Sequence, residues 1–293
     1  MELIPAKKII AKTKNQFWFG MDYNMNLYRG CHHGCIYCDS RSTCYHVEDF
    51  DTVRAKENAL KLIETELKGK RSTGVIGTGA MSDPYNREEA KALLTRHALE
   101  RIDKFGFGIG IATKSALIMR DIDILKRIDS HSPVICKISI TTYDDALAAK
   151  IEPGVSPTSE RFEAVKALSD AGIYTGILMM PILPYINDTA LNVLAIVEEA
   201  AKCGAKFIYP AFGVTLRDGQ REYFYAKLDL HFPGIKEKYI EAFGSQYGCG
   251  CPNGKALFAA FKRACESHGI LYRMEDIINA YKYERPSDQL SLF

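Results

Sequence analysis

Three cysteines in one short loop are the residues whose type and spacing suggest the most chemistry. Cys31, Cys35 and Cys38 follow a C-x3-C-x2-C spacing. Three thiolates can bind three irons of a [4Fe–4S] cube, for which the usual protein ligand set is four cysteines. The remaining iron keeps an open position, as catalytic metal sites do. Gly30 and Gly34 allow a tight loop, because glycine reaches positive φ without steric cost.

Two other roles for these cysteines compete with the cluster. A structural zinc site would recruit Cys44 or His46 as its fourth ligand, since zinc accepts mixed sulfur and nitrogen sets. The spacing is unusual for zinc, and the sequence lacks a second C-x2-C half-site. A disulfide framework is disfavoured because the nine cysteines are odd in number and suit a reducing compartment. The cluster is therefore the favoured interpretation.

Composition sets broad limits on the fold and the location of the chain. Its 293 residues, 47% of them hydrophobic and 25% charged, are typical of an ordinary globular protein. A net charge of +2 neither favours nor excludes nucleic acid, so any basic surface must be local. The N-terminal residues lack an apolar signal core, and no apolar run reaches the length of a membrane span. We expect a cytoplasmic protein that does not associate with membranes.

Apolar strand-like runs alternate with amphipathic segments over the first two-thirds of the chain. This alternation predicts an α/β fold whose parallel strands are joined by right-handed helical crossovers. Six such units, without a clear seventh and eighth, predict a partial (β/α)6 TIM-like barrel over residues 1–215, an extension over 216–284 and a flexible tail over 285–293. The predicted strands are 26–29, 74–79, 107–113, 134–142, 174–180 and 207–212, and the predicted helices are 55–67, 87–104, 122–128, 159–171, 190–203, 255–267 and 274–280.

Short polar motifs follow the predicted strands, where parallel barrels bind their ligands. Together with the cysteine loop, and in the same order along residues 20–215, they resemble the spore photoproduct lyase-like branch of the radical S-adenosylmethionine (SAM) superfamily. The motifs are Ser82-Asp83-Pro84-Tyr85, Thr113-Lys114-Ser115, Arg120-Asp121-Ile122-Asp123, Ser139-Ile140-Thr141, Glu152-Pro153-Gly154 and Pro181-Ile182.

The resemblance implies a [4Fe–4S] cluster and SAM as cofactors, with SAM chelating the open iron. It places Tyr37 beside the adenine and Ser82 near the methionine amino group. Lys114 matches a cation that pairs with the SAM carboxylate, and Ser139 matches a position that contacts the ribose hydroxyls. It also implies an external electron donor such as flavodoxin or ferredoxin.

One position departs from the pattern of true spore photoproduct lyases. They resemble this chain in the loop after the second strand but carry a hydrogen-donating cysteine where this chain has Ala80. The chain is therefore similar to the family without matching spore photoproduct lyase itself. Cys249, Cys251 and Tyr85 are candidate replacement donors. Alternatively, the two cysteines are packing thiols or form a minor metal site.

A basic and aromatic segment follows the predicted barrel and suggests nucleic acid. Arg217, Arg221 and Lys227 alternate with aromatic residues that can stack on bases, although a solvated loop leading into a helix has the same composition. We expect an enzyme that cleaves SAM reductively to a 5′-deoxyadenosyl radical and repairs or modifies DNA as a photolesion-type lyase. The alternatives are an RNA, peptide or small-molecule substrate, and a non-catalytic metal-stabilised module associated with DNA.

The last five residues resemble the peptide by which bacterial replication and repair proteins dock on the sliding clamp. In an extended peptide, Leu290, Leu292 and Phe293 would fill hydrophobic pockets of the clamp. Gln289 would be the polar anchor, and Ser291 lies between the two leucines. The alternative is that the final apolar residues fold back onto the body of the protein.

A peptide of residues 287–293 should bind purified bacterial sliding clamp with micromolar affinity, because so small a contact buries little area. Leu292→Ala and Phe293→Ala should abolish this binding, which calorimetry or fluorescence anisotropy would measure. Undetectable binding, or an affinity that both substitutions leave unchanged, would refute the clamp assignment.

Overall fold

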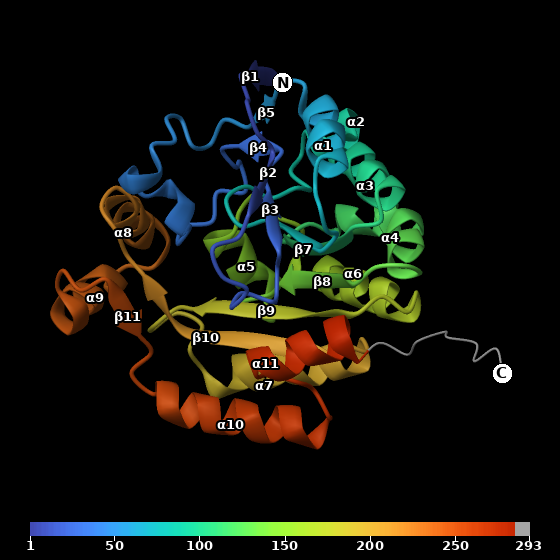
Figure 1. Ribbon diagram of the computed structural model, residues 1–293. Helices are drawn as coiled ribbons and strands as arrows, with labels where there is room; N and C mark the ends of the chain where they lie inside the picture. The colour runs from blue at the N-terminus through green and yellow to red at the C-terminus, as the bar shows by residue number, and fades with distance from the viewer. Residues whose placement is uncertain (285–293) are drawn as a thin grey trace.

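The computed structural model describes residues 1–284, so the predicted clamp-binding pentapeptide lies outside the described residues. An open eight-stranded sheet forms the centre of the molecule (Figure 1). Its strands, in spatial order, are β2 (Ile10–Lys12), β3 (Tyr23–Met25), β6 (Val75–Thr78), β7 (Gly108–Thr113), β8 (Val134–Ser139), β9 (Thr175–Ile182), β10 (Phe207–Thr215) and β11 (Gly248–Gly250).

The six strands from β3 to β10 run parallel, and an antiparallel strand adds to each edge. This arrangement confirms the predicted partial (β/α)6 barrel. Five of the six predicted strands are confirmed to within three residues at each end. Their apolar runs are continuous because parallel strands in such a fold are covered on both faces.

The predicted first strand, residues 26–29, is wrong. The barrel instead begins at β3, while β4 (Tyr28–Arg29) pairs with β5 (Arg54–Lys56) in a separate three-stranded sheet with β1 (Glu2–Ile4). The apolar signal of β3 is weak because the polar Asn24 stands in its middle. The β5 strand also shortens the predicted helix 55–67.

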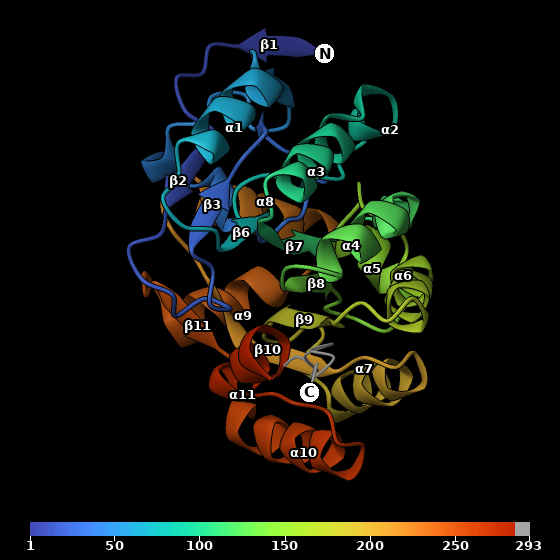
Figure 2. The same ribbon diagram turned by 45° about the vertical axis from the view of Figure 1, so that its right-hand side comes forward.

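Helices cover the outer face of the curved sheet, one after another from β3 to β10 (Figure 2). The predicted helix 87–104 is interrupted at Leu93, which has a φ of 52° and separates α2 from α3. The covering helices are α1 (Ala59–Lys68), α2 (Glu89–Ala92), α3 (Leu94–Lys104), α4 (Ile122–Asp129), α5 (Asp145–Ile151), α6 (Thr158–Asp170) and α7 (Ala190–Lys202).

The chain after β10 adds further elements to this barrel. The glycine-rich run 248–254 forms β11 and the start of α10, and Cys249 pairs with Val214 of β10. The absent side chain of Gly213 permits this pairing, because a Cβ there would lie 2.6 Å from the Cys249 carbonyl oxygen. The helices of this part are α8 (Gln220–His231), α9 (Ile235–Phe243), α10 (Gly254–Ser267), α11 (Met274–Ile278) and a π-helical turn (Asn279–Tyr283).

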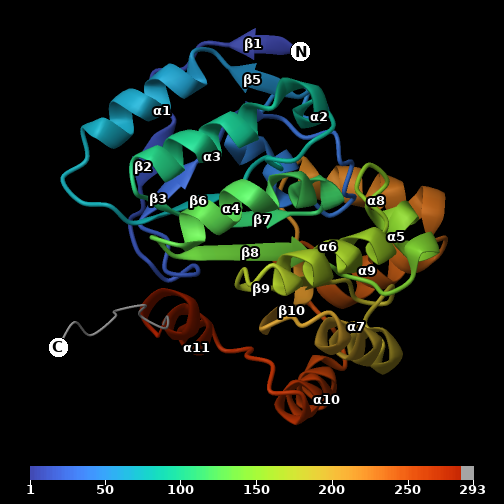
Figure 3. The same ribbon diagram turned by 90° about the vertical axis from the view of Figure 1, so that its right-hand side faces the viewer.

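The α11 helix and the π-helical turn pack across the N-terminal ends of the parallel strands (Figure 3). Ile277 and Tyr281 join a buried cluster with Phe19 and Phe207. The Tyr281 hydroxyl donates to the Phe19 carbonyl at 2.5 Å, and Lys282 Nζ donates to the Gly20 carbonyl at 2.6 Å. These contacts close the lower end of the barrel interior. None of the helices in residues 1–284 combines the length and apolar character needed to cross a membrane.

Replacing Tyr281 by phenylalanine should lower the free energy of unfolding by about 1–3 kcal/mol, because the buried Phe19 carbonyl loses its donor. Tyr283→Phe is the matched control, since Tyr283 is 65% exposed and should change stability by less than about 0.5 kcal/mol. Chemical denaturation of both variants measures the difference. Equal stabilities would show that the hydrogen bond does not hold this end of the barrel closed.

Candidate active site

The cysteine loop lies directly after β4 and is fixed by backbone contacts to other loops. Cys31 and Cys35 are buried and Cys38 is half-buried, and none of the three forms a disulfide. The Cys31 amide donates to the Phe50 carbonyl at 2.7 Å. Gly30 has a φ of 78°, and a Cβ there would lie 2.1 Å from the Thr52 carbonyl oxygen. The loop therefore requires glycine at this position, as the sequence predicts for a tight wrap.

The Glu152-Pro153-Gly154 motif supports the same loop from the other side. The Gly154 amide donates to the His33 carbonyl at 2.8 Å. A Cβ at Gly154 would lie 2.4 Å from the His32 carbonyl oxygen, so the two loops are in backbone contact. A motif separated from the cysteines by more than a hundred residues is thus part of their cradle.

The donor set at this loop fits a polynuclear cluster with three thiolate ligands. Burial raises the pKa of the Cys31 thiol to about 11, with a further contribution from nearby Asp83, so its thiolate needs a compensating positive charge such as bound iron. Cys44, a proposed fourth ligand for zinc, is exposed, and its Sγ lies 3.9 Å from Arg217 Nη1. No three His, Cys, Asp or Glu side chains within residues 1–284 gather around a single-ion position.

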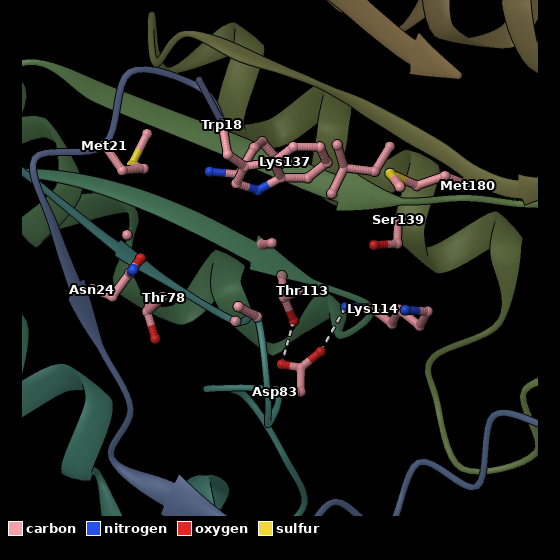
Figure 4. Close-up of a pocket in the computed structure, with 15 residues that line it drawn as sticks. Trp18, Met21, Asn24, Thr78, Asp83, Thr113, Lys114, Lys137, Ser139 and Met180 are labelled. Carbon is pink, nitrogen blue, oxygen red and sulfur yellow. Dashed lines mark hydrogen bonds between the residues drawn. The ribbon is translucent and has the colours of Figure 1, made fainter. Parts of the chain in front are cut away.

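Asp83 connects the cysteine loop to the ends of two strands (Figure 4). Its Oδ1 accepts from Thr113 Oγ1 at 2.6 Å and from the Tyr85 amide at 2.9 Å. Its Oδ2 accepts from the Lys114 amide at 2.8 Å and lies 3.5 Å from His33 Nδ1. One buried carboxylate therefore fixes the loops after β6 and β7 relative to the cysteines.

A buried ion pair joins the end of β8 to the same loop. Arg161 Nη1 donates to Glu152 Oε2 at 2.7 Å and to the Ser139 carbonyl at 2.8 Å, and the Tyr37 hydroxyl donates to Glu152 Oε1. Burial by itself raises the pKa of Glu152, but Arg161 and Lys114 outweigh it, so the pKa is lowered and Glu152 is a carboxylate.

These loops surround a cavity of about 280 Å³ inside the barrel, below the cysteine loop. Its walls come from five of the parallel strands, the loops that follow β6 and β7, and the segment that precedes β3 (Figure 4). The lining residues are Trp18, Met21, Asn24, Gly77, Thr78, Gly79, Ala80, Asp83, Ala112, Thr113, Lys114, Lys137, Ser139, Leu178 and Met180. Apolar walls with a few converging polar groups are typical of small-molecule sites.

Lys114 lines the upper part of this cavity, and its Nζ lies 5.8 Å from the centre of the Tyr37 ring. Burial disfavours its charge, but Cys35, Glu152 and Asp83 outweigh burial and raise the pKa of Lys114. Its Nζ makes no hydrogen bond to another residue in the described part of the chain. The ammonium group is therefore available for a ligand carboxylate.

The structure separates the other predicted SAM contacts into two groups. Ser139 lines the cavity, as does Ala80 at the position of the family's hydrogen donor. Ser82 and Tyr37 are not among the lining side chains. The Ser82 hydroxyl donates to the Gly30 carbonyl at 2.6 Å, and the Tyr37 hydroxyl is held by Glu152. Both support the cysteine loop.

The three candidate hydrogen donors also lie outside the cavity lining. Cys249 belongs to an apolar cluster between the cysteine loop and α8 and α9. Cys251 Sγ lies 3.4 Å from the Ile182 carbonyl oxygen. Tyr85 is buried in the outer core, with the Arg120 guanidinium 5.9 Å from its ring centre. Their positions agree with packing roles for the two thiols.

Several lining residues carried no recognised signal in the sequence. Trp18 and Met21 precede β3 in a segment without periodicity, and Asn24 interrupts the apolar pattern of that strand. Lys137 alternates with Ser139 along β8, which was the one available sign that it faces inward.

Comparison with known proteins identifies the superfamily to which this chain belongs. The family model of the radical SAM superfamily matches residues 25–197, more than half of the chain, and the chain belongs to this superfamily. Its cofactors are accordingly a [4Fe–4S] cluster and SAM, and its activity is that of a radical SAM enzyme.

Sequence relatives include proteins of bacteria, an archaeon and a virus. An uncharacterized protein of Mycobacterium tuberculosis, Rv2578c, is 28% identical over 247 residues, which cover 81% of this chain and 72% of the relative. An uncharacterized protein of Methanocaldococcus jannaschii, MJ0683, is 35% identical over 188 residues, which cover 63% of this chain and 68% of the relative.

Solved structures share the fold at low sequence identity. A spore photoproduct lyase complexed with a dinucleoside spore photoproduct has a TM-score of 0.65 and 16% identity, over 92% of this chain and 81% of that one. The radical SAM methyltransferase TsrM of Kitasatospora setae, with cobalamin and a [4Fe–4S] cluster bound, has a TM-score of 0.58 and 11% identity, over 88% of this chain and 56% of that one. The resemblance to the spore photoproduct lyase-like branch is thereby supported at the level of fold.

Cys31→Ala, Cys35→Ala and Cys38→Ala should each abolish the visible absorbance of the anaerobically reconstituted cluster, because each removes one thiolate ligand. The exposed Cys44 provides the matched control, and Cys44→Ala should retain full iron and sulfide content. Loss of the cluster from the Cys44 variant would point instead to a site with four cysteine ligands.

Proposed function

We propose that this enzyme uses radical chemistry to repair or modify DNA, as a lyase related to the photoproduct lyases. The observation that carries the proposal is the cavity, which extends from Ala80 and Lys114 at the carboxyl ends of β6 and β7 to Trp18, a residue that is 39% exposed. A substrate group can therefore enter the barrel and lie beside SAM. The likeness in fold to a spore photoproduct lyase bound to a dinucleoside photoproduct supports DNA as the source of that group.

The residues of the chain have distinct tasks in this proposal. When bound, the cluster and SAM supply a 5′-deoxyadenosyl radical that abstracts hydrogen from the substrate, after one-electron reduction by a donor such as flavodoxin or ferredoxin. Lys114 neutralises the SAM carboxylate, and Ser139 holds the ribose. Ser82, Tyr37 and Glu152 fix the cysteine loop so that the cluster and the cavity keep their relative positions.

A lesion in duplex DNA must leave the base stack to reach the cavity. Trp18 is well placed to receive an extruded base, since indole rings stack on any base. The cavity volume of about 280 Å³ is on the scale of a small molecule and excludes a paired duplex.

A cluster of cations and aromatic rings near the cysteine loop is the proposed DNA contact. The Arg217 guanidinium lies 4.8 Å from the ring centre of Tyr247, and its Nη2 donates to the Tyr247 hydroxyl at 2.9 Å. Its Nε donates to Asp39 Oδ1 at 3.0 Å, and the side chain remains 40% exposed. Lys227 Nζ lies 5.3 Å from the ring of Tyr223. Arg221, by contrast, donates to backbone carbonyls of residues 244–246 and holds the fold. The DNA contact thus rests on Arg217 and Lys227, with the tail proposed to raise local concentration by tethering to the sliding clamp.

The test is 5′-deoxyadenosine formation by the reconstituted, reduced enzyme with SAM and ultraviolet-irradiated DNA. We expect irradiated DNA to stimulate the reaction and to lose photoproduct by mass spectrometry, whereas unirradiated DNA, RNA and no substrate give only background. Arg217→Ala should weaken DNA binding in a salt-dependent manner, because it removes a phosphate contact. Arg263→Ala, on the exposed face of α10, is the matched control.

If RNA, a peptide or a small molecule stimulates 5′-deoxyadenosine formation and irradiated DNA does not, the substrate is not DNA. Equal DNA binding by the Arg217 and Arg263 variants would remove the proposed contact surface.

A further inference from the structure

Lys137 is a second lysine in the barrel cavity, deeper than Lys114. Along β8, Val134, Cys136 and Ile138 pack in the outer core, so the alternating residues face inward. Lys137 and Ser139 accordingly both line the cavity, and Lys137 is only 2% exposed (Figure 4). Lysine is almost never fully buried unless it is paired.

No carboxylate pairs with this amine. Lys137 makes neither a hydrogen bond nor an ion pair with any residue in the described part of the chain. Asp83 is the one carboxylate in the cavity lining, and its two oxygens already accept from Thr113 and from the Tyr85 and Lys114 amides. Lys137 Nζ instead lies over the Phe19 ring, whose centre is 5.1 Å away.

The neighbouring strand leaves room for the amine. A Cβ at Gly110 of β7 would lie 3.2 Å from Lys137 Nζ and 2.5 Å from Met21 Sδ. The bare backbone at Gly110 therefore accommodates both side chains. The Lys137 side chain extends along the inside of the barrel next to Gly110, which has no side chain. Its position therefore depends on residues of both β8 and β7.

The environments of the two cavity lysines differ. Lys114 lies among Cys35, Glu152 and Asp83, which favour its charge. For Lys137, burial lowers the pKa to about 7, and Cys136 offsets only part of this effect. An anion beside Lys137 would supply the missing partner, and its attraction would be strong in a site from which water is largely excluded.

We propose that Lys137 binds an acidic group of the substrate, a phosphate or a carboxylate, inside the barrel. SAM carries one carboxylate, and Lys114 at the end of β7 accounts for it in the proposed function. The group at Lys137 is therefore a second anion, brought by the substrate. Asn24 and Thr78 supply further polar groups in the same cavity. This assignment does not depend on whether the substrate is DNA.

The test uses the reconstituted enzyme with SAM bound and matched pairs of probes. Thymidine 5′-monophosphate is compared with thymidine, orotate with uracil, and inorganic phosphate is tested alone. The first readout is acetylation of Lys137 by acetic anhydride, mapped by peptide mass spectrometry on the wild-type protein. The acidic member of a pair should protect Lys137 while its neutral partner does not. Lys255, exposed on α10, should acetylate at a constant rate.

The second readout is calorimetric affinity for whichever acidic probe protects. Lys137→Met should weaken this binding about 30-fold or more, while Lys137→Arg should retain most of it, because only methionine removes the charge. Protection by the phosphate probes alone identifies a phosphate, and protection by orotate alone identifies a carboxylate.

Three results would overturn the proposal. They are equal acetylation of Lys137 with and without every acidic probe, equal protection by acidic and neutral partners, and equal affinity of the wild-type and methionine proteins. The acetylation measurement needs no variant, so it stands even if the methionine protein does not fold. A failure of the DNA assay with Lys137 protection intact would reject the DNA assignment alone.

Discussion

The buried ion pair between Glu152 and Arg161 is the interaction on which the site depends. It joins α6 to the Ser139 carbonyl at the end of β8 and, through the Tyr37 hydroxyl, to the cysteine loop. Removing either charge would leave the other buried without a partner, at a cost of about 3–5 kcal/mol. The position of the cysteine loop thus depends on a charge pair outside that loop, and Arg161 of this pair belongs to α6, a helix that covers the sheet.

Polar networks, more than the apolar core, fix the upper end of this barrel. The outer core holds the strands together, but Asp83 and Glu152 decide where their loops lie. Both carboxylates have most of their acceptor positions filled by protein donors, so neither is left to pair with Lys137. The two lysines consequently meet very different surroundings within one cavity. That contrast underlies the separate roles proposed for them, Lys114 with the cofactor and Lys137 with the substrate.

The features that sequence predicted well are those that local pattern encodes. The cysteine spacing indicated the cofactor, and continuous apolar runs located five of the six parallel strands. The first strand was misplaced because Asn24 faces the cavity and breaks the apolar pattern. Cys249 and Cys251 attracted attention as reactive residues, yet their burial is a property of three-dimensional packing that spacing does not reveal. The alternation of Lys137 with Ser139 along β8 indicated that Lys137 faces inward, but only the curvature of the sheet brings it and Trp18 to one cavity.

The closure of the lower barrel by α11 and the π-helical turn has a consequence for biosynthesis. These elements follow all six parallel strands in the chain. While the protein is being made, the aromatic residues Phe19 and Phe207 therefore remain uncovered until residue 281 has left the ribosome. Exposed apolar surface of this kind promotes aggregation of partly folded chains. The nascent barrel is consequently most vulnerable late in translation, after its catalytic loop has already been synthesised.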